Sequence, residues 1–170
     1  HLNFLEYDDR ATFYNSLPTD SDAVIISGDI AEAPSIQEIL IEMSTILNMP
    51  LYFVLGNHDY YFGNIAEIRS NMIKLCEETD LLFWLNHYEP IFFDKSICLI
   101  GIDGWADGRH GNFIKTPVRI NDSRLIKDLF HESILGRHAL LEKMQSLADD
   151  DAKLLEQKLM KALKEDPKHC

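Results

Sequence analysis

Three short runs of apolar residues stand out in the first two-thirds of the chain, and each ends at a glycine or an aspartate. The runs cover residues 23–27, 51–55 and 97–102, and they lead into Gly28, Gly56 and Asp103. An apolar run of about five residues bounded by glycine is typical of a strand that is buried on both faces. The pattern therefore predicts three strands in the interior of a sheet.

Between these runs the apolar residues recur at helical spacing. One face of residues 35–47 carries Ile36, Ile39, Leu40, Met43 and Leu47. Residues 65–75 repeat the pattern behind Asn64, which can cap a helix, and residues 9–17 are expected to form a further short helix. The order strand, helix, strand, helix, strand predicts an α/β fold with a mainly parallel sheet flanked by helices.

Part of the sheet is expected to be antiparallel. Residues 83–85 and 90–94 form two more short apolar runs, and only Lys95 and Ser96 separate the second of them from the run at 97–102. A two-residue connection is short enough for a hairpin turn, which pairs its strands antiparallel. The predicted sheet is therefore mixed.

The second half of the chain begins with a long loop. Periodicity disappears over residues 103–121, and four of the eight glycines lie between residues 101 and 111. A loop of this length is typical of a lid over a site. A helix capped by Asp122 or Ser123 and ended by Gly136 is expected to follow it.

One long amphipathic helix is predicted over residues 138–164. Its apolar face carries Leu141, Met144, Ala148, Leu155, Leu159 and Leu163. The three aspartates at residues 149–151 are expected to lie on its solvated face.

Composition indicates one folded domain over residues 1–170, since 46% of the residues are apolar and no linker or low-complexity tract interrupts the chain. No apolar run approaches the length of a membrane span. The 28 acidic and 16 basic side chains give a formal net charge of −12, which disfavours nucleic acid and anionic membranes as partners.

The widely spaced Cys76, Cys98 and Cys170 favour reduced thiols and a cytoplasmic location, with Cys76 and Cys98 expected to be buried. The oligomeric state has no signal in the sequence.

Metal-binding side chains follow each predicted strand. Asp29 comes after the first strand, residues 57–59 (Asn, His, Asp) after the second and Asp103 after the third. Ligands of α/β sheets bind at the carboxyl ends of the strands, and these oxygen and imidazole groups suit manganese, iron or zinc. Each of these groups taken alone could also be explained by a structural turn after the strand, without any metal site. However, Gly28 and Gly56 stand 28 positions apart and each is followed by a metal-binding oxygen, which favours a shared site.

Two segments resemble a known family. Gly28 and Asp29 with Glu32, and the four residues from Gly56 to Asp59, are similar to the second and third signature blocks of the calcineurin-like metallophosphoesterases. The first block of that family is Asp-x-His, and His1 is interpreted as its histidine. The resemblance implies a metallophosphoesterase-like layered fold that is truncated at both ends here, with an aspartate before His1 and further histidine blocks beyond residues 166–170, where the next strand would begin.

The resemblance also implies a role for each matching residue. Asp29 would bridge two divalent metal ions (manganese, iron or zinc), Asn57 would bind one of them through its side-chain carbonyl, and His1 would bind the other. His58 would be no ligand but would face the phosphate and protonate the leaving oxygen. Glu32 would orient His58 through a hydrogen bond. A hydroxide bridging the two metals would attack phosphorus.

Weaker candidates for substrate binding lie in the predicted lid. His110 and Arg109 could contact substrate from the loop, and Asp103 ends a strand on the same side of the sheet. Arg119 and Arg124 could also bind an anion. The alternatives are a solvated loop histidine, ordinary surface arginines, and an aspartate that only stabilises its glycine turn.

The expected function is that of a phosphomonoesterase acting on a small phosphate ester or a phosphoprotein. One alternative is a phosphodiesterase or nuclease of the same superfamily, which the absence of a cationic track disfavours. Another is a scaffold that keeps the fold without catalysis. The joint presence of Asp29, Asn57, His58 and Glu32 favours an enzyme.

Overall fold

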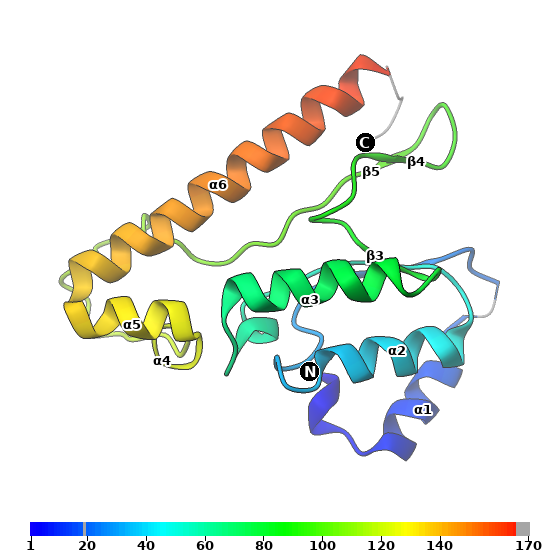
Figure 1. Ribbon diagram of the computed structural model, residues 1–170, viewed down its shortest axis with the longest axis horizontal. Helices are drawn as coiled ribbons and strands as arrows, with labels where there is room; N and C mark the ends of the chain where they lie inside the picture. The colour runs from blue at the N-terminus through cyan, green and yellow to red at the C-terminus, as the bar shows by residue number, and fades with distance from the viewer. Residues whose placement is uncertain (19, 166–170) are drawn as a thin grey trace.

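A three-stranded parallel sheet organises the N-terminal half of the molecule (Figure 1). The computed structural model describes residues 1–18 and 20–165. Its elements are η1 (Leu2–Phe4), α1 (Tyr7–Asn15), β1 (Val24–Ser27), α2 (Ile36–Leu47), β2 (Leu51–Val54), η2 (His58–Tyr60), α3 (Ile65–Glu77), β3 (Leu82–Trp84), β4 (Ile91–Phe92), β5 (Cys98–Leu99), α4 (Asp122–Leu125), α5 (Lys127–Leu135) and α6 (Arg137–Lys164). The predicted α/β fold with a mainly parallel sheet flanked by helices is confirmed. The next strand that the sequence places at residues 166–170 lies outside the described residues.

The third strand of the sheet is not the predicted one. The sheet has the order β1–β2–β3, so Leu82–Trp84 occupies the position that the sequence assigned to residues 97–102. Within that run only Cys98–Leu99 is a strand, and it pairs antiparallel with β4 in a separate two-stranded sheet. Asp94 accepts hydrogen bonds from Ser96 and from the Ile97 backbone, which close the tight turn between β4 and β5. The predicted hairpin is correct, but it does not join the main sheet.

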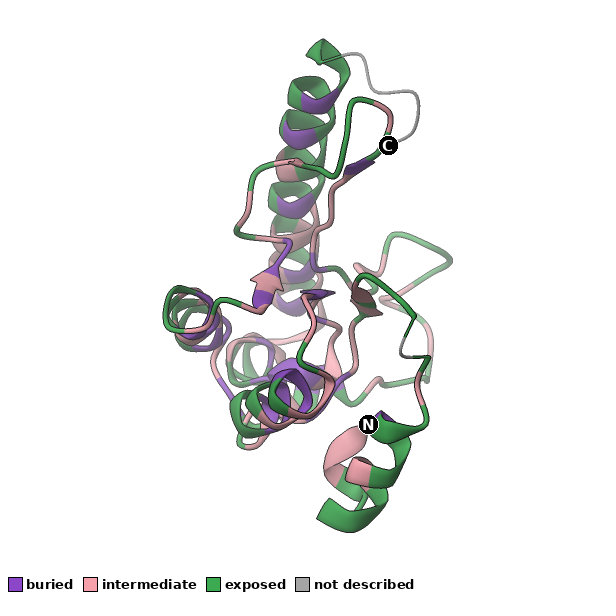
Figure 2. Cartoon of the chain, turned by 90° about the vertical axis from the view of Figure 1, so that its right-hand side faces the viewer, coloured by how far each residue is buried: buried purple, intermediate pink, exposed green. Residues whose placement is uncertain are grey.

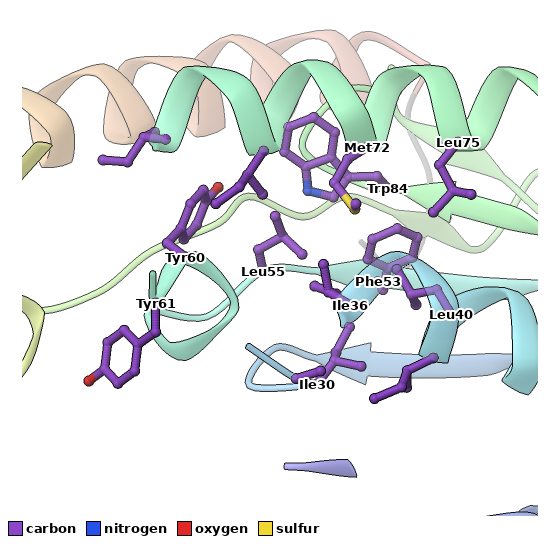
Figure 3. Packing of buried hydrophobic residues seen from close by; sticks show 14 of the residues in the cluster. Ile30, Ile36, Leu40, Phe53, Leu55, Tyr60, Tyr61, Met72, Leu75 and Trp84 are labelled. Atoms are coloured by element: carbon purple, nitrogen blue, oxygen red, sulfur yellow. The ribbon is translucent and has the colours of Figure 1, made fainter. Parts of the chain in front are cut away.

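The two faces of the parallel sheet differ in burial. The strand register aligns Val24 with Leu51 and Leu82, and it aligns Ile26 with Phe53 and Trp84. These six residues share the face that packs against α2 and α3 in one hydrophobic cluster. Figure 3 shows Met72 and Leu75 of α3 pointing towards Trp84 and Phe53. Burying this cluster is the main stabilising contribution to the β–α–β–α–β unit.

The opposite face of the sheet is only partly covered. It carries Ile25, Tyr52 and Phe83 in register. Tyr52 stacks on Phe83 with 4.9 Å between the ring centroids and meets the edge of Phe93, which follows β4, at 5.4 Å. Ile25 remains 63% exposed. The hairpin region therefore shields the β2–β3 part of this face and leaves β1 open.

The helix predicted between Asp122 and Gly136 is divided in two. Ile126 has an extended backbone (φ −90°, ψ 118°) between α4 and α5. Hydrogen bonds from Phe62 N to Leu125 O (2.7 Å) and from Lys127 N to Gly63 O (3.1 Å) hold the chain open there and turn the fully buried Ile126 side chain into the core. These tertiary contacts override the helical pattern. The predicted end of α5 at Gly136 is confirmed.

Helix α6 has the predicted length, and Met144 of its predicted apolar face is buried, but the C-terminal half of the helix buries a different face. Leu155, Leu159 and Leu163 are 38%, 39% and 55% exposed, whereas Asp151 and Lys158 are buried. Figure 2 shows α6 as an upright helix that is buried along one side and exposed along the other. The rotation is set by polar partners that the helix meets in the rest of the fold.

Lys158 Nζ donates to three backbone carbonyls, Leu85 O, Asn86 O (3.0 Å) and Gly101 O (3.2 Å). Asp151 pairs with Arg69 of α3 at 3.1 Å. The expectation that residues 149–151 are all solvated is therefore wrong for Asp151.

Cys76 and Cys98 are buried, as predicted, and Cys170 lies outside the described residues. Burial raises the pKa of the Cys76 thiol to about 11, so it is protonated at neutral pH. Among the described residues, no helix has the length and apolar character that crossing a membrane requires.

Candidate functional site

The carboxyl ends of β1 and β2 approach each other so closely that each requires glycine. Gly28 has a φ of +91°, and a Cβ on it would lie 2.6 Å from Gly56 N. A Cβ on Gly56 would lie 2.2 Å from Oδ1 of Asp29. Both distances are shorter than van der Waals contact, so the glycines allow the two loops to touch. This close approach brings Asp29 and Asn57 to the same edge of the sheet, where the sequence predicts them to lie.

Asp59 binds the two loops together. Its Oδ2 accepts backbone N–H groups of Asp29 (2.9 Å) and Gly56 (2.7 Å), and its Oδ1 accepts those of Ile30 (2.7 Å) and Ala31 (2.9 Å). The carboxylate is fully buried. Burial raises the pKa of Asp59 to about 6, against the opposing effect of the backbone hydrogen bonds. The turn-stabilising role predicted for Asp59 thus extends across both loops.

A group of side chains that could hold a cation lies at this junction. One ligand atom each from His1, Asp29 and His58 lies within 4.8 Å of the others. Leu2 N donates to Ile30 O (2.8 Å), which places His1 beside Asp29, and His58 N donates to Asp29 Oδ1 (3.2 Å). Asp29 itself has a left-handed backbone, with φ of +54°. The structure therefore brings together two imidazoles and one carboxylate from three separate segments.

Asn57 precedes His58 and is oriented from a distant part of the chain. Its Nδ2 donates to Oδ1 of Asp122 at 2.8 Å, and the hydroxyl of Tyr61 donates to the same oxygen at 2.9 Å. The Tyr61 ring stacks on His58 with 4.3 Å between centroids. Burial and the neighbouring Asp122 raise the pKa of Tyr61 well above its usual value, so its hydroxyl remains a donor.

An open pocket of about 440 Å³ lies next to these groups. Asn57 and His58 line it on one side, and Trp105 and Arg119 line it from the two ends of the loop over residues 103–121. A pocket of this volume can accept a small organic molecule. The loop predicted to be a lid therefore borders the site, and its movement as a lid stays a prediction.

Two of the substrate-binding candidates lie elsewhere. Arg109 pairs with Asp107 at 2.6 Å and with Asp149 of α6 at 2.7 Å, so its guanidinium is directed to the long helix. His110 lines a separate, more apolar hollow together with Phe113 and Met144. The structure brings neither residue to the pocket beside Asn57, whereas Arg119 does reach it.

Asp103, the third candidate, is fully buried beneath the site. Its carboxylate accepts hydrogen bonds from Leu55 N (2.7 Å), the Tyr60 hydroxyl (2.7 Å) and Trp84 Nε1 (2.9 Å). Burial raises the pKa of Asp103, while these donors oppose the shift. Asp103 supports the end of β2 from within the core and does not line the pocket.

Glu32 is half-buried near the start of α2, and its backbone carbonyl accepts N–H groups of Ser35 and Ile36. In the part of the chain that the structure describes, no hydrogen bond joins the Glu32 side chain to His58. Its predicted orienting role, like the ligand roles of His1, Asp29 and Asn57, stays a prediction.

Sequence reasoning missed Asp122, Tyr61 and Trp105 as members of the site. Asp122 was expected only as a helix cap, and it lies 65 positions from Asn57, beyond the reach of any local pattern. Tyr61 carried a signal, because it follows Asn57 by four positions, the spacing of one helical turn.

A model of one protein family, described as calcineurin-like phosphoesterase, matches residues 4–165. The match covers nearly all of the chain, and the chain therefore belongs to the calcineurin-like phosphoesterase family. No curated protein and no solved structure matches the chain. Family membership implies metal-dependent hydrolysis of phosphoesters and binding of divalent metal ions, and it confirms the resemblance seen in the residues around Gly28 and Gly56.

Proposed function

We propose that the protein is a phosphomonoesterase that uses two divalent cations held by His1, Asp29 and Asn57. The convergence of His1, Asp29 and His58 within 4.8 Å, beside a pocket that His58 and Asn57 line, carries this proposal. The donor set fits the metals, since carboxylate, amide oxygen and imidazole groups without a nearby thiolate suit manganese, iron or zinc. Bound cations would supply an activated water and neutralise charge on the phosphate.

Asp29 is the residue suited to serve both cations. It has two oxygens on one side chain, and it lies near His1 and against the loop that carries Asn57. Two cations a few ångströms apart repel each other strongly, and a shared carboxylate offsets that repulsion.

His58 and Arg119 would act on the phosphate itself. Both line the pocket, and His58 is fixed by the stacking of its ring on Tyr61. A protonated imidazole there can donate a proton to the leaving oxygen. Arg119 makes no ion pair within residues 1–18 and 20–165, so its guanidinium can bind phosphate oxygens.

The proposed substrate is a small phosphate ester or a phosphoprotein. The net charge of −12 and a single arginine in the pocket favour a compact anionic group over a long polyanion. A phosphodiesterase or nuclease is the enzymatic alternative, and a non-catalytic scaffold is the other. The cytoplasmic location expected from the cysteines stays a prediction.

The test compares p-nitrophenyl phosphate with bis(p-nitrophenyl) phosphate, after chelation and after adding back Mn²⁺. We expect Mn²⁺-dependent hydrolysis that is at least about tenfold faster for the monoester, and its loss in Asp29→Asn. Faster hydrolysis of the diester would favour the phosphodiesterase alternative. No metal-dependent hydrolysis of either ester, by folded protein, would favour the scaffold.

A further inference from the structure

Asp122 lies against the metal-ligand candidate Asn57 although the two are far apart in the sequence. It is the first residue of α4, is only 4% exposed, and accepts the Asn57 side-chain amide at 2.8 Å. Nothing in the family resemblance assigns it a role. Its placement therefore needs a physical explanation of its own.

The segment that carries Asp122 is firmly attached to the loop that carries Asn57. Phe62 N donates to Leu125 O at 2.7 Å, and Lys127 N donates to Gly63 O at 3.1 Å. These bonds bracket the loop after Asn57, so the position of the Asp122 carboxylate relative to Asn57 is fixed by backbone contacts.

The chemistry of the pair determines how the Asn57 amide is turned. An ionised carboxylate can only accept hydrogen bonds, so the group facing it must be the NH₂ of Asn57. A flipped amide would place Oδ1 against the Asp122 oxygen at the same 2.8 Å with no hydrogen between them. The observed contact thus directs Oδ1, the only amide atom that can bind a cation, away from Asp122.

Tyr61 fixes the carboxylate in turn. Its hydroxyl donates to Oδ1 of Asp122 at 2.9 Å, and its ring stacks on His58. The same oxygen of Asp122 therefore receives donors from Asn57 and from Tyr61. One aromatic residue in this way connects the orientation of Asn57 to the position of His58.

We infer that Asp122 is a positioning residue for metal binding, which holds the Asn57 amide with its carbonyl oxygen towards the cation. The inference rests on the proposed role of Asn57 as a ligand. Partners that orient metal ligands typically account for about 10–100-fold in metal affinity. Removing the acceptor frees the amide to rotate and weakens binding, whereas an acceptor without charge preserves the orientation.

The experiment measures Mn²⁺ affinity by calorimetry on chelator-stripped protein, with and without substitutions at residue 122. We expect Asp122→Ala to weaken binding about tenfold. Asp122→Asn keeps a carbonyl acceptor for both donors and is expected to stay within about threefold of the original affinity. Equal losses in the two variants would overturn the inference, because the charge of Asp122 and not its acceptor would then matter.

A double-mutant cycle separates this inference from the proposed function. If Asp122 acts through Asn57, then Asn57→Ala weakens binding and adding Asp122→Ala to it causes no further loss. Additive losses would contradict the positioning role. Unchanged affinity in Asn57→Ala would overturn the proposed metal site as well, whereas loss in Asn57→Ala without loss in Asp122→Ala would overturn the positioning role alone.

A second measurement distinguishes a positioning role of Asp122 in metal binding from a role in the stability of the fold alone. The melting temperature is compared with chelator and with saturating Mn²⁺, and the rise caused by Mn²⁺ is expected to shrink in Asp122→Ala. Asp128→Ala is the matched control, since Asp128 accepts only the Ile65 backbone at 2.8 Å among its described hydrogen bonds. It should lower both melting temperatures and leave their difference unchanged. An unchanged Mn²⁺-induced rise in Asp122→Ala would contradict the inference.

Discussion

Gly56 illustrates how much of the site depends on the absence of a single side chain. A Cβ there would lie 2.2 Å from Asp29 Oδ1 and 2.8 Å from Asp29 N. The same residue donates its N–H to Asp59, which also accepts the N–H of Asp29. A carboxylate oxygen of Asp29 therefore occupies the space that glycine leaves in the other loop.

Gly56→Ala is expected to displace the Asp29 carboxylate and weaken Mn²⁺ binding by more than about tenfold, since ligands must be held in position to within a fraction of an ångström. Titration calorimetry on the stripped protein measures this loss. Gly104→Ala is the control, because no atom lies within 4 Å of a Cβ at Gly104. If both variants bound Mn²⁺ like the original protein, the close approach of the two loops would be irrelevant to the site.

The sequence was informative for residues next to strand ends and silent on distant ones. Asp29, Asn57 and Asp59 could be predicted as neighbours because the carboxyl ends of parallel strands meet at one edge. Asp122 could not, since its approach depends on tertiary hydrogen bonds around Ile126. Asp103, at the end of a predicted strand, is a buried support because Leu55, Tyr60 and Trp84 donate hydrogen bonds to it.

Among the elements, α6 shows most clearly what amphipathic patterning leaves open. Its length followed from the sequence, but its rotation follows from Lys158, which donates to three carbonyls, and from Asp151, which pairs with Arg69. Unpaired carbonyls in the interior cost more than the exposure of a few leucines. Polar contacts therefore selected the buried face.

Lys158→Met is expected to destabilise the protein by about 2–3 kcal/mol, because it leaves carbonyl groups of residues 85, 86 and 101 without this donor. Urea unfolding followed by circular dichroism measures the change. Lys153→Met, on the exposed side of the same helix and 3.7 Å from Asp150, should change stability by less than about 0.5 kcal/mol. Equal effects of the two substitutions would contradict the buried role of Lys158.

Helices α1 and α2 are joined by a pair of hydrogen bonds between Arg10 and Glu42, at 2.8 Å and 2.7 Å. The hydrogen bonds and charge of Arg10 lower the pKa of Glu42 below its ordinary value of 4.5. A carboxyl whose pKa falls on folding contributes stability above its unfolded pKa and loses that contribution as pH drops through its folded pKa.

Glu42→Gln is therefore expected to cost about 1 kcal/mol at pH 7, with both partners only slightly exposed. The difference from the original protein should vanish as the pH falls from about 4.5 to below the lowered pKa of Glu42. Unfolding curves at a series of pH values provide the comparison. A difference that persisted at the lowest pH would show that the carboxylate charge is not its source.

In the molecule as a whole, the repeating β–α–β–α–β order was predictable and the assignment of its last strand was not. Residues 81–85 and residues 97–102 are both apolar runs, and the run that follows α3 completes the sheet. The short connection after α3 delivers Leu82–Trp84 directly beside β2. Chain connectivity thus decided which of the two apolar runs joins the main sheet.

The two tryptophans of the chain stand in contrasting surroundings. Trp84 is 2% exposed and donates to Asp103, whereas Trp105 lines the pocket beside His58 and lies 5.2 Å from the Tyr60 ring. Intrinsic fluorescence should therefore contain a blue-shifted component that is insensitive to ligand and a second component that changes on ligand binding. Inorganic phosphate added with Mn²⁺ should alter only the second component, and Trp105→Phe should abolish the response. The fold thus supplies an optical reporter of site occupancy without any attached dye.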